Sequence, residues 1–347
     1  MIIMYHSHLS EEERNKLNSF DKIIIWGFPL HTHTHSYIHA MWKKVFQEGF
    51  GKETYWFHEK DFPTDFNYGN CLFITEGYAD TNIPILASSV YFVHNAIDPM
   101  KYKHARLIDI RFHVNEMRDI NFDFKLDDGT HEIVSLSDET KYEKLTSNKD
   151  LYKREVTAMD YECIYMYWAT DLLPHEFDYN IQVTHEPTIY YIGSPCITYN
   201  LHRFAQLCKA NQINFVHNDP WVNPISFEEN RMAMKRSLLC PDFRPVSSPK
   251  DIEEFGIKNG KNHMEIGYLP CRILKAISYG KLGMTDCPAV KDILKEHVVY
   301  EADMFELLKR SMTERVDTDR IKRAMKYIEE RHTYVQRVRD LLRALLR

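Results

Sequence analysis

Residues 22–28 read KIIIWGF, a short apolar run between Asp21 and Pro29. Such a run is typical of a strand that is buried on both faces, as in a parallel sheet. The polar loop HTHTHS follows, and residues 36–50 (SYIHAMWKKVFQEGF) then place apolar side chains at helical spacing up to Gly49. ETYWFHE at 53–59 predicts the next strand. The chain therefore opens as strand, loop, helix and strand, the start of a doubly wound α/β domain.

The same sheet is expected to continue through residue 174. Residues 71–77 (CLFITEG) and 89–95 (SVYFVHN) predict two further strands, with a short helix over 81–88. The DDG at 127–129 is typical of a hairpin turn. ECIYMYWATDLLP at 162–174 predicts a last buried strand that ends in a polar turn at Thr170–Asp171.

A second start of the same kind appears at Thr188. TIYYIGS at 188–194 is strand and small-residue loop, 200–213 predict a helix, and NFVHND at 214–219 predicts a second strand. This repeats the opening pattern near residue 22, although not its letters. It indicates two Rossmann-like halves joined near residues 175–187.

The second half continues with clear helix signals. Ser226 and Glu229 form a capping box at the start of a helix, and Pro270 and Gly280 bracket another. Further strands are expected at 238–243, 282–286 and 298–303, with a short helix at 289–296. A long amphipathic segment at 318–346 ends the chain, and DTD at 317–319 predicts its cap.

The composition of the chain excludes several classes. Its 347 residues are 44% hydrophobic and 27% charged, with a net charge of −6 and only 12 Gly. The hydrophobic and charged fractions are ordinary for a soluble globular protein. The low number of Gly residues argues against a turn-rich all-β fold. We expect no membrane span, no signal peptide and no nucleic acid as the main partner. The seven scattered Cys, with no CxxC, predict reduced thiols, a cytoplasmic location and no structural zinc.

The helix over 268–280 carries the first candidate site. Arg272 and Lys275 lie three residues apart and share a face in its first turns. A helix N-terminus favours an anion, and a cation pair added there fits a diphosphate. The structural alternative is that both side chains are solvated or pair with nearby acidic residues.

The loops after the strands of the second half carry further candidates, because ligands of open α/β sheets bind outside the carboxyl ends of the strands. They are Gly193 and Ser194, Asn218 with Asp219, and the run Pro241, Asp242, Phe243, Arg244. Together with Arg272 and Lys275 they outline a nucleotide pocket. Neither GxGxxG nor GxxxxGK[ST] occurs, so neither a dehydrogenase nor a P-loop ATPase is supported.

The run HTHTHSYIH holds His31, His33, His35 and His39. Three interpretations remain open. Alternating His could bind zinc, or they could line a cleft where one acts as general base or binds a sugar or phosphate. The third interpretation is a polar loop with one or two packed imidazoles. Asp171 is a similar cleft candidate, with a helix cap before Leu172 as its structural alternative.

The two Rossmann-like halves, the GYLPCRILKAISYG helix leading into LGMTD, and the long terminal helix resemble the GT-B glycosyltransferases, especially compact viral and phage-type members. The Glu-x7-Glu of the common retaining pattern is absent, since no acidic residue follows Glu265 at that spacing. The resemblance implies two Rossmann-like domains facing a central cleft, with the C-terminal helix returning to the first domain. The domains expected are 1–182 plus about 330–347, and 183–329.

The resemblance also implies a function in glycan biosynthesis. A hexosyl or deoxyhexosyl group would pass from a nucleotide sugar such as UDP- or GDP-sugar to an acceptor hydroxyl, usually without a metal, in the cytoplasm, or the host cytoplasm for a viral member. Expected catalytic residues are His31, His33, His35 and Asp171. Expected diphosphate ligands are Ser194, Arg272, Lys275 and Ser278. Expected base and ribose contacts are Gly193, Asn218, Pro241, Asp242, Phe243, Arg244 and Tyr268.

A rival class is the metal-dependent hydrolase. There, an HxH after the first strand begins a binuclear site in a (β/α)8 barrel, and His31-Thr-His33 follows KIIIWGFPL as that class requires. The chain does not display eight βα units, and the hairpin-like region 109–150 interrupts them. A third possibility is a nucleotide-sugar-binding module without activity.

Overall fold

The computed structural model describes residues 5–33, 35–111, 121–125, 131–135, 152–155, 162–193, 199–220, 222–243 and 269–346. The chain divides into two compact units. Unit 1 holds the described residues up to Tyr167 together with the C-terminal residues from Tyr334 on, and unit 2 runs from Trp168 to Thr333. The boundary therefore lies at Trp168 instead of residue 183, because Leu172 packs against Cys240 and Tyr279 in a core of unit 2.

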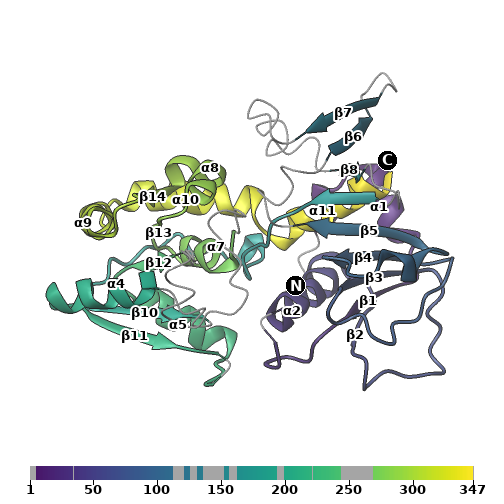
Figure 1. The fold of residues 1–347 in the computed structure, drawn as a ribbon, viewed down its shortest axis with the longest axis horizontal. Helices are drawn as coiled ribbons and strands as arrows, with labels where there is room; N and C mark the ends of the chain where they lie inside the picture. The colour runs from purple at the N-terminus through teal and green to yellow at the C-terminus, as the bar shows by residue number, and fades with distance from the viewer. Residues whose placement is uncertain are drawn as a thin grey trace. The chain divides into compact units, whose positions relative to one another are not determined.

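Unit 1 is built on one mixed sheet, with the strand order β2-β1-β3-β4-β5-β9-β8-β6-β7 (Figure 1). The first six strands in this order are parallel to one another, and β8, β6 and β7 add to the sheet by antiparallel pairing. Their bounds are β1 Lys22–Trp26, β2 Thr54–Phe57, β3 Cys71–Glu76, β4 Val90–His94, β5 Arg106–Arg111, β6 Asn121–Lys125, β7 His131–Ser135, β8 Tyr152–Glu155 and β9 Glu162–Tyr165. The strands predicted at 22–28, 53–59, 71–77 and 89–95 are confirmed, and β6 pairs with β7 around the predicted hairpin turn, whose own residues lie outside the described ones.

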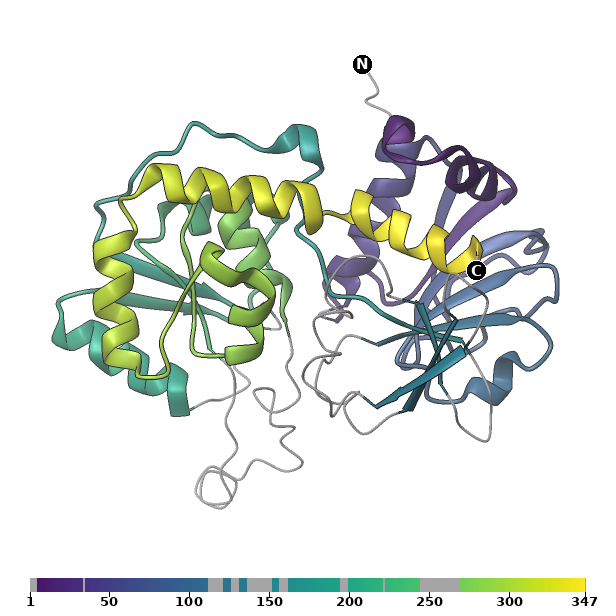
Figure 2. The ribbon, with the colours of Figure 1, turned by 90° about the horizontal axis from the view of Figure 1, so that it is seen from above.

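Helices lie over one face of the parallel half of this sheet. Helix α2 (Ser36–Lys44), extended by a π-helical turn at Val45–Gly49, contacts β1 and β2. Helix α11 (Tyr334–Leu346) contacts α1 (Glu11–Asn18), and Figure 2 shows the two helices side by side. The C-terminal segment from Tyr334 on thus belongs to unit 1.

Aromatic side chains close the other face. Trp26, Phe73 and Tyr91 from neighbouring strands pack in one core cluster with loop residues such as Phe62 and Phe66. The helix predicted over 81–88 is wrong: this segment is a non-helical loop. The Tyr91 hydroxyl replaces helical hydrogen bonds there, since it donates to Pro84 O (2.7 Å) and accepts from the Leu86 N–H (2.9 Å). Aromatic side chains therefore cover a sheet face that has loops where a doubly wound fold has helices.

Unit 2 repeats the arrangement on a smaller scale. Strands β10 (Thr188–Ile192) and β11 (Asn214–Asn218) are parallel, as are β12 (Cys240–Asp242), β13 (Gly283–Thr285) and β14 (Val298–Tyr300). The Leu238 N–H donates to Thr188 O (2.8 Å), so the segment entering β12 lies beside β10. The two sheets, β10-β11 and β12-β13-β14, thus adjoin through β10 and β12, in a succession that corresponds to β2-β1-β3-β4-β5 of unit 1. In both units the first strand lies between the second and the third, which confirms the repeated opening pattern at 22 and 188.

Six helices accompany these strands among the described residues of unit 2: α4 Tyr199–Ala210, α5 Phe227–Arg236, α7 Cys271–Ser278, α8 Pro288–Leu294, α9 Met304–Glu314 and α10 Thr318–Arg331. The Ser226–Glu229 capping box is present in both directions, at 3.1 and 2.7 Å. Asp317 caps α10 by accepting from the Arg320 N–H at 2.9 Å, so the cap predicted for the DTD run is confirmed. Pro270 precedes α7, and Gly280 follows it at φ +82°, a conformation that favours Gly.

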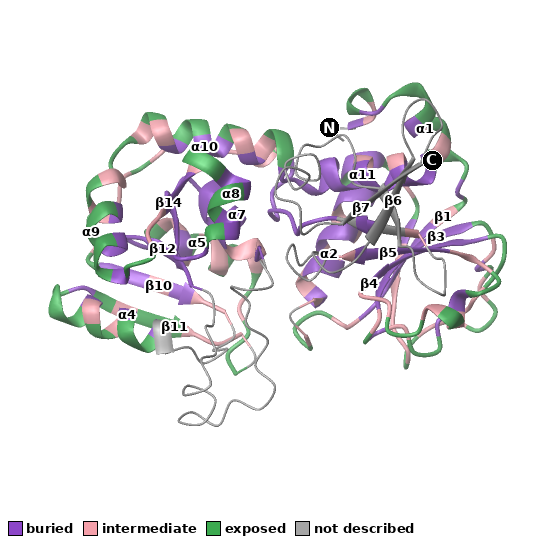
Figure 3. Cartoon of the chain, turned by 45° about the horizontal axis from the view of Figure 1, so that its top comes forward, coloured by how far each residue is buried: buried purple, intermediate pink, exposed green. Residues whose placement is uncertain are grey.

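The terminal amphipathic segment is two helices, not one. His332 leaves helical geometry at φ −128°, and its carbonyl accepts from the Thr170 N–H at 2.9 Å. Thr333 forms a β-bridge with Thr170. Pairing with an extended segment 163 residues away therefore ends α10, although the apolar period continues into α11. Figure 3 shows buried residues along both helices, and no helix in the described ranges is long and apolar enough to cross a membrane.

Arg337 on α11 holds a buried ionic site in unit 1. Its Nε donates to Tyr167 O (2.7 Å) and its Nη1 lies 3.4 Å from Asp340 Oδ2. Burial lowers the pKa of Arg337 and raises that of Asp340. The Arg337→Ala variant strands a buried carboxylate and should lose about 3–5 kcal/mol in free energy of unfolding, measured by urea denaturation.

Lys60→Ala is the matched surface control, because Lys60 pairs at 3.9 Å with Glu59 while 81% exposed. It should change the free energy of unfolding by less than about 1 kcal/mol. Equal losses in the two variants would contradict a structural role for the Arg337–Asp340 pair.

Candidate functional site

Each unit gathers polar side chains at the carboxyl ends of its parallel strands. In a sheet whose first strand lies between the second and third, the loops leaving strands one and three diverge and leave a crevice for ligands. In unit 2 this place lies after β10 and β12, and in unit 1 after β1 and β3. The two groups of residues are described separately below.

In unit 2, four predicted residues come together after β10, β11 and β12. Ile192 is in register with Asn218, and the Gly193 N–H donates to Asn218 O at 3.1 Å. Asp242 ends β12 and is fully buried. Arg272, in the first turn of α7, reaches both: its Nη1 lies 3.6 Å from Asp242 Oδ1 and its Nε donates to Ile192 O at 2.9 Å. These contacts join segments that are up to 80 residues apart.

The Arg272 guanidinium is held on three sides. It lies 4.2 Å from the centroid of the Tyr191 ring, and Nη1 donates to the Tyr191 hydroxyl at 2.7 Å. A Cβ at Gly193 would lie 1.9 Å from Nη2, so only Gly leaves room for this side chain. Nη2 itself donates no hydrogen bond within the described part of the chain. A fixed guanidinium with an outward N–H pair is suited to an oxyanion such as phosphate.

Lys275 and Ser278, predicted beside Arg272, have other neighbours. Lys275 is buried, with Nζ 3.9 Å from Asp171 Oδ2 and 5.4 Å from the centre of the Phe227 ring. Ser278 Oγ donates to Lys275 O (2.9 Å) and lies 2.7 Å from Thr170 Oγ1. The acidic pairing that the sequence left open as the structural alternative is therefore present for both Arg272 and Lys275.

Asp171 is a buried residue of unit 2. It is 2% exposed and accepts from the Tyr279 hydroxyl at 2.6 Å. Burial, followed by the Asp171 charge, raises the pKa of Tyr279 well above its usual value. Asp171 does not cap a helix at Leu172, because the next helical turn is a 3-10 turn at Pro174–Glu176. Asp171 forms an internal polar network with Lys275 and Tyr279.

The other predicted nucleotide contacts are either buried or outside the described residues. The Phe243 ring is 2% exposed and packs 4.7 Å from Phe204, in the core of unit 2, and Pro241 is buried in β12. Ser194, Arg244 and Tyr268 lie outside the described residues.

In unit 1, two of the predicted His meet an acidic residue that the sequence analysis did not select. Nδ1 of His33 lies 3.9 Å from Glu76 Oε1, and Nδ1 of His35 is in contact with Glu76 Oε2. Glu76 ends β3 and is 1% exposed. His94, at the end of β4, has its ring centre 6.0 Å from that of His35. His31 is exposed and bonds to the Tyr37 hydroxyl through Nδ1 at 3.1 Å, so it lies outside this group.

A simple signal could have found Glu76 and His94. Both are polar residues at the carboxyl end of an otherwise apolar strand, the rule that selected Asn218 and Asp242 in the second half. Tyr191 gave no such signal, because it reads as an ordinary strand residue.

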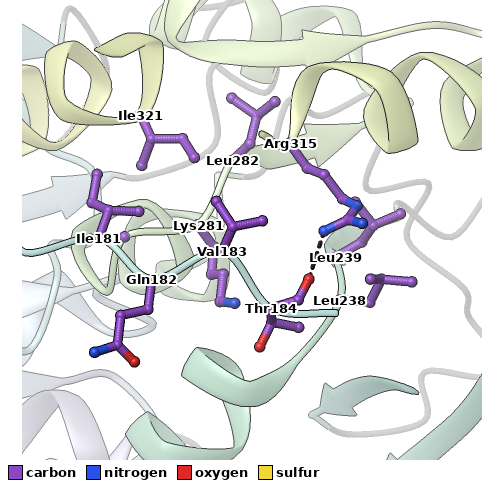
Figure 4. Close-up of a pocket in the computed structure, with 11 residues that line it drawn as sticks. Ile181, Gln182, Val183, Thr184, Leu238, Leu239, Lys281, Leu282, Arg315 and Ile321 are labelled. Atoms are coloured by element: carbon purple, nitrogen blue, oxygen red, sulfur yellow. Dashed lines mark hydrogen bonds between the residues drawn. The ribbon is translucent and has the colours of Figure 1, made fainter. Parts of the chain in front are cut away.

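Unit 2 also contains a small, partly open cavity, drawn in Figure 4. It encloses about 10 Å³, enough for one water molecule at most. Lys281 and Arg315 line it, and Arg315 donates to Thr184 O at 2.6 Å. Burial lowers the pKa of Lys281. The cavity is too small to hold a nucleotide.

Comparison of the chain with family models, curated proteins and solved structures finds no match. The functional interpretation therefore depends on the residues themselves.

His39 behaves as a core residue of unit 1. A Cβ at Gly27 would lie 2.1 Å from its imidazole, and the residue is 3% exposed. Burial, reinforced by the nearby His33, lowers the pKa of His39 to about 3. Between about pH 6.5 and 3 the unfolded chain therefore binds a proton that the folded chain does not, and stability falls as the pH falls through this window.

We expect the loss to approach about 1.4 kcal/mol per pH unit below 6.5, measured by urea denaturation from pH 7 to 4. His39→Gln should flatten this dependence, whereas His202→Gln, at an exposed position on α4, should leave it unchanged. An equal pH slope in the wild type and His39→Gln would refute the assignment.

Proposed function

We propose that the chain is a glycosyltransferase of GT-B type that binds a nucleoside-diphosphate sugar in unit 2. One observation carries the proposal: Arg272 is fixed at the carboxyl ends of β10 and β12, with its Nη2 over Gly193. The two adjoining sheets of unit 2 place their strands in the succession found in nucleotide-binding α/β domains, which bind their ligands at this place. The diphosphate would accept hydrogen bonds from Arg272 Nη2 and from backbone N–H groups at the start of α7.

The chemistry of the transfer explains why a fixed cation is useful. The bond between the anomeric carbon and the diphosphate oxygen breaks, a bond to the acceptor oxygen forms, and the acceptor hydroxyl loses a proton. Negative charge grows on the leaving nucleoside diphosphate. A guanidinium already held by Tyr191 and Asp242 stabilises that charge without reorganising during the reaction.

The remaining predicted residues take roles that fit their burial. Asn218 is half-buried and, with its side chain bonded to Asn223, offers polar atoms to a ribose or base. Asp242 and Lys275 are buried positioning residues, one for Arg272 and one for the Asp171–Tyr279 network. In unit 1, His31 is exposed, so its imidazole can orient or deprotonate an acceptor hydroxyl.

The hydrolase alternative keeps one supporting observation, the approach of His33 and His35 to Glu76. The barrel that it requires is not formed by the described strands. Their sheet is open, with β2 at one edge and β7 at the other, and three strands are antiparallel. Glycosyl transfer is therefore the function we put forward.

The first test is a thermal-shift panel of UDP-, GDP-, CDP- and TDP-sugars, each with and without EDTA. A ligand that binds only the folded state raises the melting temperature. We expect one nucleotide to do so, insensitive to EDTA. If no nucleotide shifts the transition and EDTA lowers it, the glycosyltransferase proposal is wrong and a metal-dependent hydrolase gains support.

The double variant Arg272→Ala/Lys275→Ala should abolish the nucleotide shift while the protein remains folded. Because Lys275 is buried beside Asp171, Arg272→Ala alone is the sharper variant. Arg236→Ala, at an exposed position on α5, is the matched control and should retain the full shift. Nucleotide binding to Arg272→Ala with the parent affinity would exclude this site.

Gly193→Ala tests the same site without removing a charge. Its added methyl group would collide with Arg272 Nη2 and displace the guanidinium. We expect nucleotide affinity, measured by calorimetry, to fall roughly 10-fold or more, since a bond to a charged group contributes about 1.5–3 kcal/mol. Unchanged affinity would show that the position of Nη2 is irrelevant to binding.

A further inference from the structure

His33, His35 and Glu76 form a compact group of metal-binding side chains in unit 1. Each offers one ligand atom, and these atoms lie within 4.8 Å of one another. The two His come from the loop after β1, and Glu76 comes from the end of the neighbouring strand β3. Parallel pairing of β1 with β3 thus brings together residues about 40 positions apart in the sequence.

Glu76 shows why this group needs a positive charge. The residue is 1% exposed, and within the described ranges its carboxylate has no hydrogen-bond donor apart from two imidazoles. The groups that face these oxygens are the imidazoles of His33 and His35. A buried carboxylate without hydrogen bonds is costly unless a cation compensates it, as an imidazolium or a metal ion can.

We propose that His33, His35 and Glu76 bind one divalent transition-metal ion of the zinc class. Two imidazoles and one carboxylate form the mixed nitrogen and oxygen donor set that zinc accepts, and three protein ligands leave one position open for water or a hydroxyl group. The site is separate from the nucleotide site proposed in unit 2 and does not depend on it.

The separation between His33 and Glu76 fits this assignment. Ligand atoms around a tetrahedral zinc ion lie about 3.3 Å apart, given metal–ligand bonds of about 2.0–2.1 Å. His33 Nδ1 and Glu76 Oε1, at 3.9 Å, are close to this separation. Nδ1 of His33 also accepts a hydrogen bond from the His35 N–H at 3.2 Å, near the upper limit for such a bond. A metal bound by this nitrogen replaces that contact.

The loop is held in a shape that presents the two imidazoles. His31 has φ +69°, an unusual conformation for a residue with a side chain, and its N–H donates to Ser36 Oγ at 3.1 Å. The Thr32 hydroxyl donates to Pro29 O at 2.6 Å. The His33 ring packs against Phe28, with ring centres 4.1 Å apart. Because these contacts already hold the loop in place, metal binding requires little further ordering of the loop.

The test is binding of Zn²⁺ alone to the EDTA-treated and dialysed full chain, by calorimetry and by elemental analysis after dialysis. We expect one Zn²⁺ per chain. His35→Ala and Glu76→Gln should each weaken binding more than about 100-fold, since loss of an outer-sphere partner alone costs about 10–100-fold. Co²⁺ should give the intense visible bands of a four-coordinate site in the parent and lose them in both variants.

His31→Ala is the matched control. It removes an imidazole from the same HTHTH run but from outside the three-residue group, so Zn²⁺ affinity should stay within about 2-fold of the parent. If Glu76→Gln binds like the parent while His31→Ala binds weakly, the His-rich loop chelates metal without β3 and the proposal is overturned. If the parent protein binds Zn²⁺ weakly or not at all, and no variant changes this, Glu76 and His35 form a proton-linked ion pair instead. That outcome also overturns the proposal. His33→Ala, at a half-buried loop position, serves in place of Glu76→Gln if the latter does not fold.

Discussion

The parallel pairing of one apolar strand with two neighbours is the constraint on which the rest of the structure depends. β1 pairs with β2 on one side and with β3 on the other, and Ile23, Ile24 and Ile25 are fully buried. A strand buried on both faces carries no polar side chain of its own, so its chemistry must lie where it ends. The loops that leave β1 and β3 diverge there, and β10 and β12 create the same condition in unit 2.

The two units share this arrangement of strands but place different side chains at the strand ends. Unit 2 places a guanidinium over a glycine, steadied by a tyrosine and a buried aspartate, which suits an anionic ligand. Unit 1 places two imidazoles against a buried glutamate, which suits a cation. Each set contains a buried carboxylate at the end of a strand. Asp242 contacts Arg272 in unit 2, and Glu76 contacts His35 in unit 1. This division of charge supports the expectation that the halves of the chain bind different ligands.

Much of the fold could be predicted because it follows local signals. The strands at 22–28 and 188–194, the capping box at Ser226 and the cap at Asp317 need only periodicity or a few neighbouring residues. The errors arose where a side-chain hydrogen bond or a strand pairing overrode the helical pattern. The Tyr91 hydroxyl organises 81–88 as a loop, and pairing of Thr170 with Thr333 ends a helix whose apolar period continues. Asp171 belongs to unit 2 because its neighbours pack against β12 and α7.

By itself, the sequence determined the α/β class, the repeated opening, most element positions and the polar residues at strand ends, because these depend on short-range spacing of side chains. Only the tertiary structure decided which of those polar residues meet. In unit 2, Arg272 contacts Asp242 and lies against Gly193, whereas Lys275 pairs with Asp171. In unit 1, Glu76 lies with His33 and His35, and His31 lies outside that group. His39 is buried against Gly27. The physical reason is that these contacts depend on the order of strands in the sheet, and no local pattern in the chain specifies that order.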